Sequence, residues 1–228
     1  MRQLAMVGLV LTLSTLVGAL PAAAAGGTIS GVVKFAGTPP APKKIAATRD
    51  KRVCGKNPIF KENLVVDKGT GGIQWAVVSL QKASGSYPAK EVVLDQRGCV
   101  YQPHVVVMAP GTLKVKNSDR ILHNVHSYSS ANPAINQAQP GFRKVMTVKF
   151  NKPERLVVRC DVHPWMEGWI VVAAHPFYAV TDAKGNFTLE NVPPGTHTLE
   201  IWQEKLGTVT KQVTVKAGEA AKVTVKMK

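Results

Sequence analysis

The feature that most constrains the fold is a series of short strand-like runs that continues through nearly the whole chain. The runs are rich in Val, Ile and Thr, and Gly, Pro, Asn and Asp separate them. Helical periodicity is almost absent, with one weak candidate at residues 132–139. Short, regularly spaced strands with turn residues between them predict an all-β protein of one or two β-sandwiches. Typical runs are "TISGVVKF", "IQWAVVSL", "HVVVMA", "RLVVRC", "HTLEIW" and "KVTVKM".

The N-terminus has the layout of a secretory signal peptide. Met1 and Arg2 precede an uncharged, mostly apolar run over residues 4–20, and small residues with an Ala-x-Ala cleavage pattern follow. The apolar run is slightly short for a membrane span. We therefore expect residues 1–25 to be removed and the mature protein to be periplasmic or extracellular, without a membrane span.

The charge is strongly basic, with 29 Lys and Arg against 14 Asp and Glu and a formal net charge of +15. The excess is spread along the chain rather than gathered into a tail. It could steer association with an acidic protein or an anionic surface, or simply keep the surface solvated. A recognition helix and stacked aromatics, which nucleic acid binding requires, are both missing, so no nucleic acid partner is expected.

Three cysteines, Cys54, Cys99 and Cys160, leave one unpaired in a compartment where thiols oxidise. In the strand-like run "RLVVRC", alternation places Cys160 on the same face as Leu156 and Val158. The chain then continues as "DVHPWM", which supplies His163 and Met166 at steps of three residues. A core strand is therefore followed at once by a cluster of metal-binding side chains.

A second strand, "ILHNVHS", supplies a further histidine. Its two histidines are three residues apart and so lie on opposite faces of a strand. We expect His123 to point inward with the apolar residues and His126 to point outward. Two histidines, a thiolate and a thioether are typical of the trigonal copper site with a weak axial Met. Zinc is the weaker interpretation because it favours further Cys or His ligands over Met.

The pair "HNVH" and "CDVHPWM" resembles the cupredoxins, and among them the amicyanin-like members, over about residues 99–172. The resemblance implies a Greek-key β-sandwich that holds one type 1 copper ion. By the same resemblance the ligands are His123, Cys160, His163 and Met166. The chain departs from small cupredoxins by an insertion at residues 127–144 and by β segments at both ends.

The same resemblance implies roles around the ligands. Asn124 would tie the two ligand loops together. The ring edge of His163 would reach the surface as the electron port, and Pro164 and Trp165 would help form an apolar docking patch. The other histidines are interpreted as surface or hydrogen-bonded residues; they are His104, His126, His175 and His197.

With Cys160 assigned to the metal, we predict a disulfide between Cys54 and Cys99. It would close a loop of about 46 residues and stabilise the fold by roughly 4 kcal/mol in the chain-entropy view. The alternative is a second metal site that these two cysteines form with His104. Simple pairing is favoured in an exported protein.

The chain ends carry a second resemblance. Residues 177–202, "FYAVTDAKGNFTLENVPPGTHTLEIW", resemble the carboxypeptidase regulatory-like domain, a transthyretin-type sandwich, and "TISGVVKFAGTPPAP" looks like its opening strands. We expect an N-terminal β segment at 26–98, a cupredoxin-like domain at 99–172 and a regulatory-like domain at 173–228. Either the two ends build one sandwich with the cupredoxin inserted, or two modules follow in series.

The function favoured by these patterns is an exported blue copper protein that carries single electrons between redox partners, for example an acidic cytochrome or a dehydrogenase. It is not expected to be an enzyme, since peptidase motifs and the His-x-His clusters of copper enzymes are absent from the sequence. The alternatives are a copper storage or delivery protein and an envelope-binding or glycan-binding β-sandwich.

Overall fold

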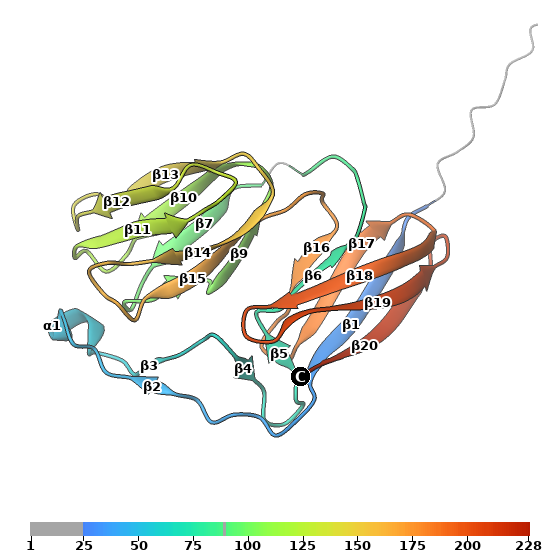
Figure 1. Ribbon diagram of the computed structural model, residues 1–228, viewed down its shortest axis with the longest axis horizontal. Coiled ribbons are helices and arrows are strands. Elements are labelled where there is room, and N and C mark those ends of the chain that lie inside the picture. Colours follow the sequence, from blue (N-terminus) through green and yellow to red (C-terminus); the bar gives the residue numbers. More distant parts are fainter. Residues whose placement is uncertain (1–24, 89) are drawn as a thin grey trace, which may run out of the picture.

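The computed structural model describes residues 25–88 and 90–228. The expected signal peptide lies outside the described residues, apart from Ala25. The described chain is nearly all β, as the sequence predicts, and forms two β-sandwiches that lie beside each other (Figure 1). None of the helices within the described ranges has the length and apolar character needed to cross a membrane.

The first sandwich, here named the terminal sandwich, is built from both ends of the chain. Strand β1 (Gly27–Phe35) lies between β17 (Asn186–Val192) and β20 (Ala220–Met227) in one sheet. The facing sheet has the order β16, β6, β18, β19. Its strands are β16 (Tyr178–Val180), β6 (Val77–Leu80), β18 (Gly195–Gln203) and β19 (Gly207–Val215).

The second sandwich, here named the central sandwich, is formed by β7 to β15. One sheet has the order β13, β10, β7, β8, and the other β12, β11, β14, β15, β9. The strands are β7 (Val92–Gln96), β8 (Tyr101–Gln102), β9 (Val105–Met108), β10 (Gly111–Asn117), β11 (His123–Tyr128), β12 (Ile135–Gln139), β13 (Val145–Phe150), β14 (Glu154–Arg159) and β15 (Glu167–Val172).

Strand pairing cuts across the expected division at residue 98. Within residues 26–98, β1 pairs with β20 and β6 pairs with β18, both in the terminal sandwich. Strand β7 instead pairs with β10 in the central sandwich. This pairing favours the alternative in which both chain ends build one sandwich. We therefore propose a division into a terminal sandwich and an inserted central sandwich that begins at β7.

The weak helix expected at 132–139 is wrong. Residues Ile135–Gln139 form β12, which pairs antiparallel with β11 from Ser127 to His123. Pairing with a neighbouring strand outweighs a marginal local helix propensity, because the edge strand gains a full hydrogen-bonded ladder. The insertion at 127–144 thus extends the sheet that carries the first histidine.

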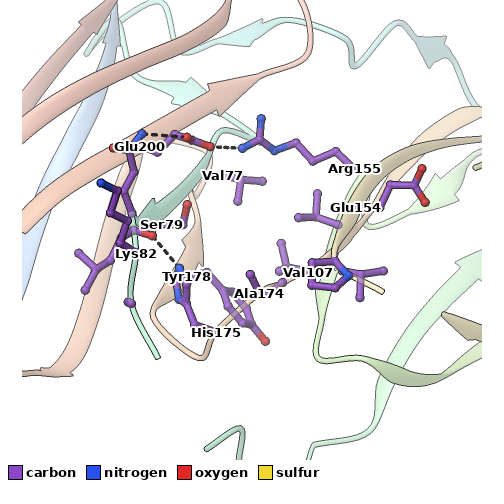
Figure 2. A pocket seen from close by; sticks show the side chains of 17 residues that line it. Val77, Ser79, Lys82, Val107, Glu154, Arg155, Ala174, His175, Tyr178 and Glu200 are labelled. Carbon is purple, nitrogen blue, oxygen red and sulfur yellow. Dashed lines mark hydrogen bonds and ion pairs between the residues drawn. The ribbon is translucent and has the colours of Figure 1, made fainter. Parts of the chain in front are cut away.

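The two sandwiches meet through a small apolar cluster of Val77, Val105, Val171 and Trp202. A cavity of about 740 Å³ lies beside this junction (Figure 2). Arg155 and Glu200 form an ion pair across it, and His175 bonds to the Leu80 carbonyl. Some of its polar groups are therefore already paired with one another.

Residues 36–64, here named the strap, leave β1, reach the central sandwich and return to the terminal one. The strap contains β2 (Lys44–Ile45), the short helix α1 (Lys51–Cys54) and β3 (Ile59–Phe60), and it leads into β4 (Val65–Val66), which pairs with β5 (Ile73–Gln74). Cys54 and Ile59 are buried in the core of the central sandwich. Figure 1 shows α1 beside the end of that sandwich where β14 leads into β15.

Replacing Ile29 tests whether the N-terminal strand is part of the terminal core. Ile29 is fully buried among residues of the C-terminal strands. We expect Ile29→Ala to lower the free energy of unfolding by about 2–5 kcal/mol. Chemical denaturation measures the loss, and hydrogen exchange should locate it in β17 and β20.

The control for this variant is Ser30→Ala, because Ser30 lies on the opposite face of β1. We expect it to change stability by less than about 0.5 kcal/mol. A loss for Ile29→Ala as small as that of the control would contradict the packing of β1 described here.

Candidate metal centre

Two neighbouring strands and one loop bring the candidate ligands together. His123 opens β11, Cys160 directly follows β14, and the loop into β15 carries His163 and Met166. The Cys160 amide donates to the Met166 carbonyl at 3.2 Å, and the Met166 amide donates to the His163 carbonyl at 2.9 Å. These bonds fold the loop tightly, so that ligands close in sequence converge in space.

Three donor atoms form a compact triangle. His123 Nδ1 lies 3.0 Å from His163 Nδ1, and Cys160 Sγ lies 3.8 and 3.7 Å from these two nitrogens. Both histidines are 0% exposed and Cys160 is 2% exposed. As the alternation predicts, His123 points inward and His126 is partly exposed, its ring bonded to Asp161.

Carboxylates occupy the other side of both rings. His123 Nε2 lies 3.0 Å from Asp119 Oδ2, and His163 Nε2 lies 2.9 Å from Asp50 Oδ2. A carboxylate accepts, so each Nε2 is the donor and each Nδ1 is left with a lone pair. Two lone pairs thus face each other at 3.0 Å beside a sulfur atom, an arrangement that a cation stabilises.

The pKa values around the triangle shift toward charged forms. Burial raises the pKa of the Cys160 thiol, but its contacts with the His123 and His163 rings and the hydrogen bond from the Asn124 amide outweigh burial and lower the pKa to about 6. Burial lowers the pKa of His123, whereas its bonds to Asp119 and Cys160 raise it, with a net rise. Without a metal, the site therefore favours a Cys160 thiolate beside a protonated His123 ring.

Asn124 joins the two ligand-bearing segments. Its Oδ1 accepts from the Asp161 amide at 2.5 Å, its Nδ2 donates to Asp161 and Asn136, and its backbone amide donates to Cys160 Sγ at 3.5 Å. The start of β11 is thereby fixed to the thiol and to the residue that follows it.

The expectation that the ring edge of His163 reaches the surface is wrong. The ring is 0% exposed because the strap covers it and Asp50 bonds to its Nε2. Trp165 is partly buried, lies edge-on to His163 and donates to the Cys99 carbonyl at 3.0 Å. Pro164 is exposed, so the expected patch is only partly on the surface.

Cys54 and Cys99 form a disulfide, and Cys160 is free and buried. The alternative of a metal site made by these two cysteines with His104 is therefore excluded, since both sulfurs are bonded. His104 instead bonds to Glu204, His175 to the Leu80 carbonyl and His197 to the Pro193 carbonyl. Each of these histidines is hydrogen-bonded, as expected.

Sequence reasoning missed Asp119 and Asp50. The sequence gives a weak indication of the contact between Asp119 and His123, because Asp119 lies four residues earlier in the turn that leads to β11. Asp50 is more than a hundred residues from His163, but it lies four residues before Cys54, so the predicted disulfide was a signal that the strap reaches the central sandwich.

The donor set fits a first-row transition-metal ion. A point equidistant from the three atoms would lie about 2.0 Å from each, close to metal–nitrogen distances of about 2.0–2.1 Å and a little under a metal–thiolate distance of about 2.3 Å. Met166 is 1% exposed in the same core cluster as Cys160.

Comparison with known protein families agrees with the resemblance to the carboxypeptidase regulatory-like domain. The profile of the carboxypeptidase regulatory-like domain matches residues 167–228, a stretch that includes β15 of the central sandwich. A comparison with curated proteins found no match. The similar solved structures include cupredoxins.

Three of these structures illustrate the extent of the likeness. A purple cupredoxin from Nitrosopumilus maritimus is 18% identical over 36% of this chain and 100% of its own, with a TM-score of 0.31. Amicyanin from Paracoccus versutus is 21% identical over 42% and 97%, with a TM-score of 0.33. A Cu-containing nitrite reductase from Thermus scotoductus SA-01 is 19% identical over 42% of this chain, with a TM-score of 0.33, and this chain spans 25% of its length.

The lowered pKa of Cys160 predicts a titration in the metal-free protein. Because the folded pKa of about 6 lies below the ordinary value of 9.0, the thiolate should persist as the pH falls from 9 to about 6 and be protonated below that. The ultraviolet absorbance of the thiolate measures this step. Cys160→Ser is the control and should lack it; a midpoint near 9 in the native protein would contradict the geometry.

Proposed function

We propose that this protein is an exported type 1 copper protein that carries single electrons between redox partners and is not itself an enzyme. His123, Cys160 and His163 would hold the copper ion, with Met166 as a weak axial ligand. The observation that carries the proposal is the buried triangle of two imidazole Nδ1 atoms and one thiol sulfur. Copper bound there would supply a one-electron couple.

The protein's own contribution would be a rigid, closed pocket. Asp119 and Asp50, which accept hydrogen bonds from the two rings, and the hydrogen bonds of Asn124 limit how far the ligands move when the charge of the site changes. Fast electron transfer favours such a site, because little reorganisation accompanies each change of charge. The Cys54–Cys99 disulfide fits the oxidising compartment that export would provide.

Copper storage or delivery is the nearest competing function. It favours open sites from which the metal exchanges readily, whereas the three donor residues here are at most 2% exposed. Reversible one-electron cycling without loss of copper would distinguish the carrier from the storage protein. An envelope-binding or glycan-binding role has less support, because part of the polar lining of the cavity between the sandwiches is already paired.

The redox partner would be an acidic protein, such as an acidic cytochrome or a dehydrogenase. The net charge of +15 would steer such a partner toward this protein. Pro164 and Trp165 remain our candidates for part of the docking patch. Leu122, which precedes His123 and is 47% exposed, adds an apolar side chain near the other ligand.

Adding Cu(II) to the mature protein tests the proposed ligands. We expect a strong visible absorption band, because a thiolate would be bound to the oxidised metal. Cys160→Ala should abolish the band and Met166→Ala should shift it. His126→Ala is the matched control and should leave the band unchanged, since that ring lies outside the triangle. A colourless protein whose Cys160 is demonstrably reduced would contradict the proposal.

Replacing Asn124 tests the link between the ligand segments. We expect Asn124→Ala to weaken copper binding about 10- to 100-fold, because hydrogen bonds around the ligands orient them. Competition with a chelator measures the affinity. Asn151→Ala, at an exposed asparagine of the same sandwich, is the control; equal affinities in both variants would assign Asn124 no role at the metal.

A further inference from the structure

The strap is fastened to the central sandwich at several points beside the candidate metal centre. Cys54 is bonded to Cys99, and Ile45, Ala47 and Val53 pack against the core cluster that contains Cys160 and Met166. The strap therefore belongs to the wall of this sandwich. It places one side chain, Asp50, against a candidate ligand.

Asp50 has a conformation that its local sequence does not explain. It stands at the N-cap of α1 with φ 45° and ψ 42°, in the left-handed region that non-glycine residues rarely occupy. An N-cap aspartate normally has extended dihedrals and accepts a hydrogen bond from its own helix. Here the side chain makes no such bond, and the backbone carbonyl of Asp50 accepts from Val53 and Cys54 instead.

The carboxylate that does not cap α1 bonds instead to His163 Nε2 at 2.9 Å. An unfavourable backbone conformation that directs a side chain to a site is a sign of function when the neighbouring structure holds it in place. The disulfide, four residues away, supplies that hold. Asp119 plays the matching part at His123, but it comes from a turn of the central sandwich itself.

We propose, on the basis of the proposed function, that Asp50 is a positioning residue that keeps His163 on the metal in both oxidation states and closes its ring edge to solvent. By accepting a hydrogen bond from Nε2–H, the carboxylate keeps the proton on Nε2 and leaves Nδ1 as the metal-binding atom. The negative charge of Asp50 also makes the His163 ring a stronger electron-pair donor to the metal. A stronger electron-pair donor stabilises Cu(II) relative to Cu(I). Electrons would therefore cross the protein surface elsewhere than at the edge of this ring.

The test compares Asp50→Asn, which keeps an acceptor oxygen without the charge, with Asp50→Ala, which removes both. Nitrogen NMR of the metal-free protein reports which ring nitrogen of His163 carries the proton. We expect the Nε2-protonated form in the native protein and in Asp50→Asn, and a mixture of the two neutral forms in Asp50→Ala. This measurement does not depend on copper.

Two further measurements use the copper-loaded protein. We expect the reduction potential to rise in both variants, since each loses the negative charge. Release of Cu(I) to a chelator should be about 10- to 100-fold faster in Asp50→Ala and nearer the native rate in Asp50→Asn. Asp67→Asn is the control, because it removes a carboxylate charge from an exposed turn outside the strap and should alter neither value.

The outcomes separate this inference from the copper proposal. In one outcome, Asp50→Ala leaves the His163 tautomer, the reduction potential and the rate of Cu(I) release unchanged from the native protein. That result would overturn the role of Asp50 even when the native protein binds copper. A native protein that binds no copper would overturn the proposed function, while the NMR result would still decide whether Asp50 orients His163. Asp50→Asn, nearly identical in shape, carries the test if Asp50→Ala does not fold.

Discussion

The structure around the candidate centre depends on one electrostatic constraint, the meeting of two imidazole Nδ1 atoms and a thiol sulfur in a buried space. Asp119 and Asp50 accept hydrogen bonds from the Nε2–H groups, so the Nδ1 atoms of His123 and His163, 3.0 Å apart, turn their lone pairs toward each other. Lone pairs buried in this way favour a positive charge between them, because the rings are 0% exposed and the hydrogen bond from the Asn124 amide reaches only the Cys160 sulfur. A proton supplies this charge in part, and a metal ion supplies it fully.

That constraint explains why three distant parts of the chain converge on one end of the central sandwich. Strand β11 brings His123, the β14–β15 loop brings Cys160 and His163, and the strap brings Asp50. The strap comes from the terminal sandwich and returns to it, so a segment that connects two strands of the terminal sandwich covers the centre. The site would accordingly depend on the disulfide between Cys54 and Cys99 as well as on its ligands.

The sequence predicts the local parts of this arrangement well. Alternation along β11 and β14 suffices to turn His123 and Cys160 inward, because one buried face fixes the strand register. The cysteine count likewise favours the Cys54–Cys99 pair. The exposure of His163 could not be predicted, since it depends on Asp50, which reaches the ring only through long-range packing of the strap. The strand at Ile135–Gln139 was missed for a similar reason, as its partner lies in β11.

The most direct test of the central claim is X-ray absorption at the copper edge of the loaded protein. We expect two nitrogen neighbours at about 2.0 Å and one sulfur neighbour at no more than about 2.3 Å, with the short sulfur contribution lost in Cys160→Ser. Copper bound by nitrogen and oxygen alone, with the same spectrum in Cys160→Ser, would contradict it. In that case the triangle of His123, His163 and Cys160 would not be a copper site.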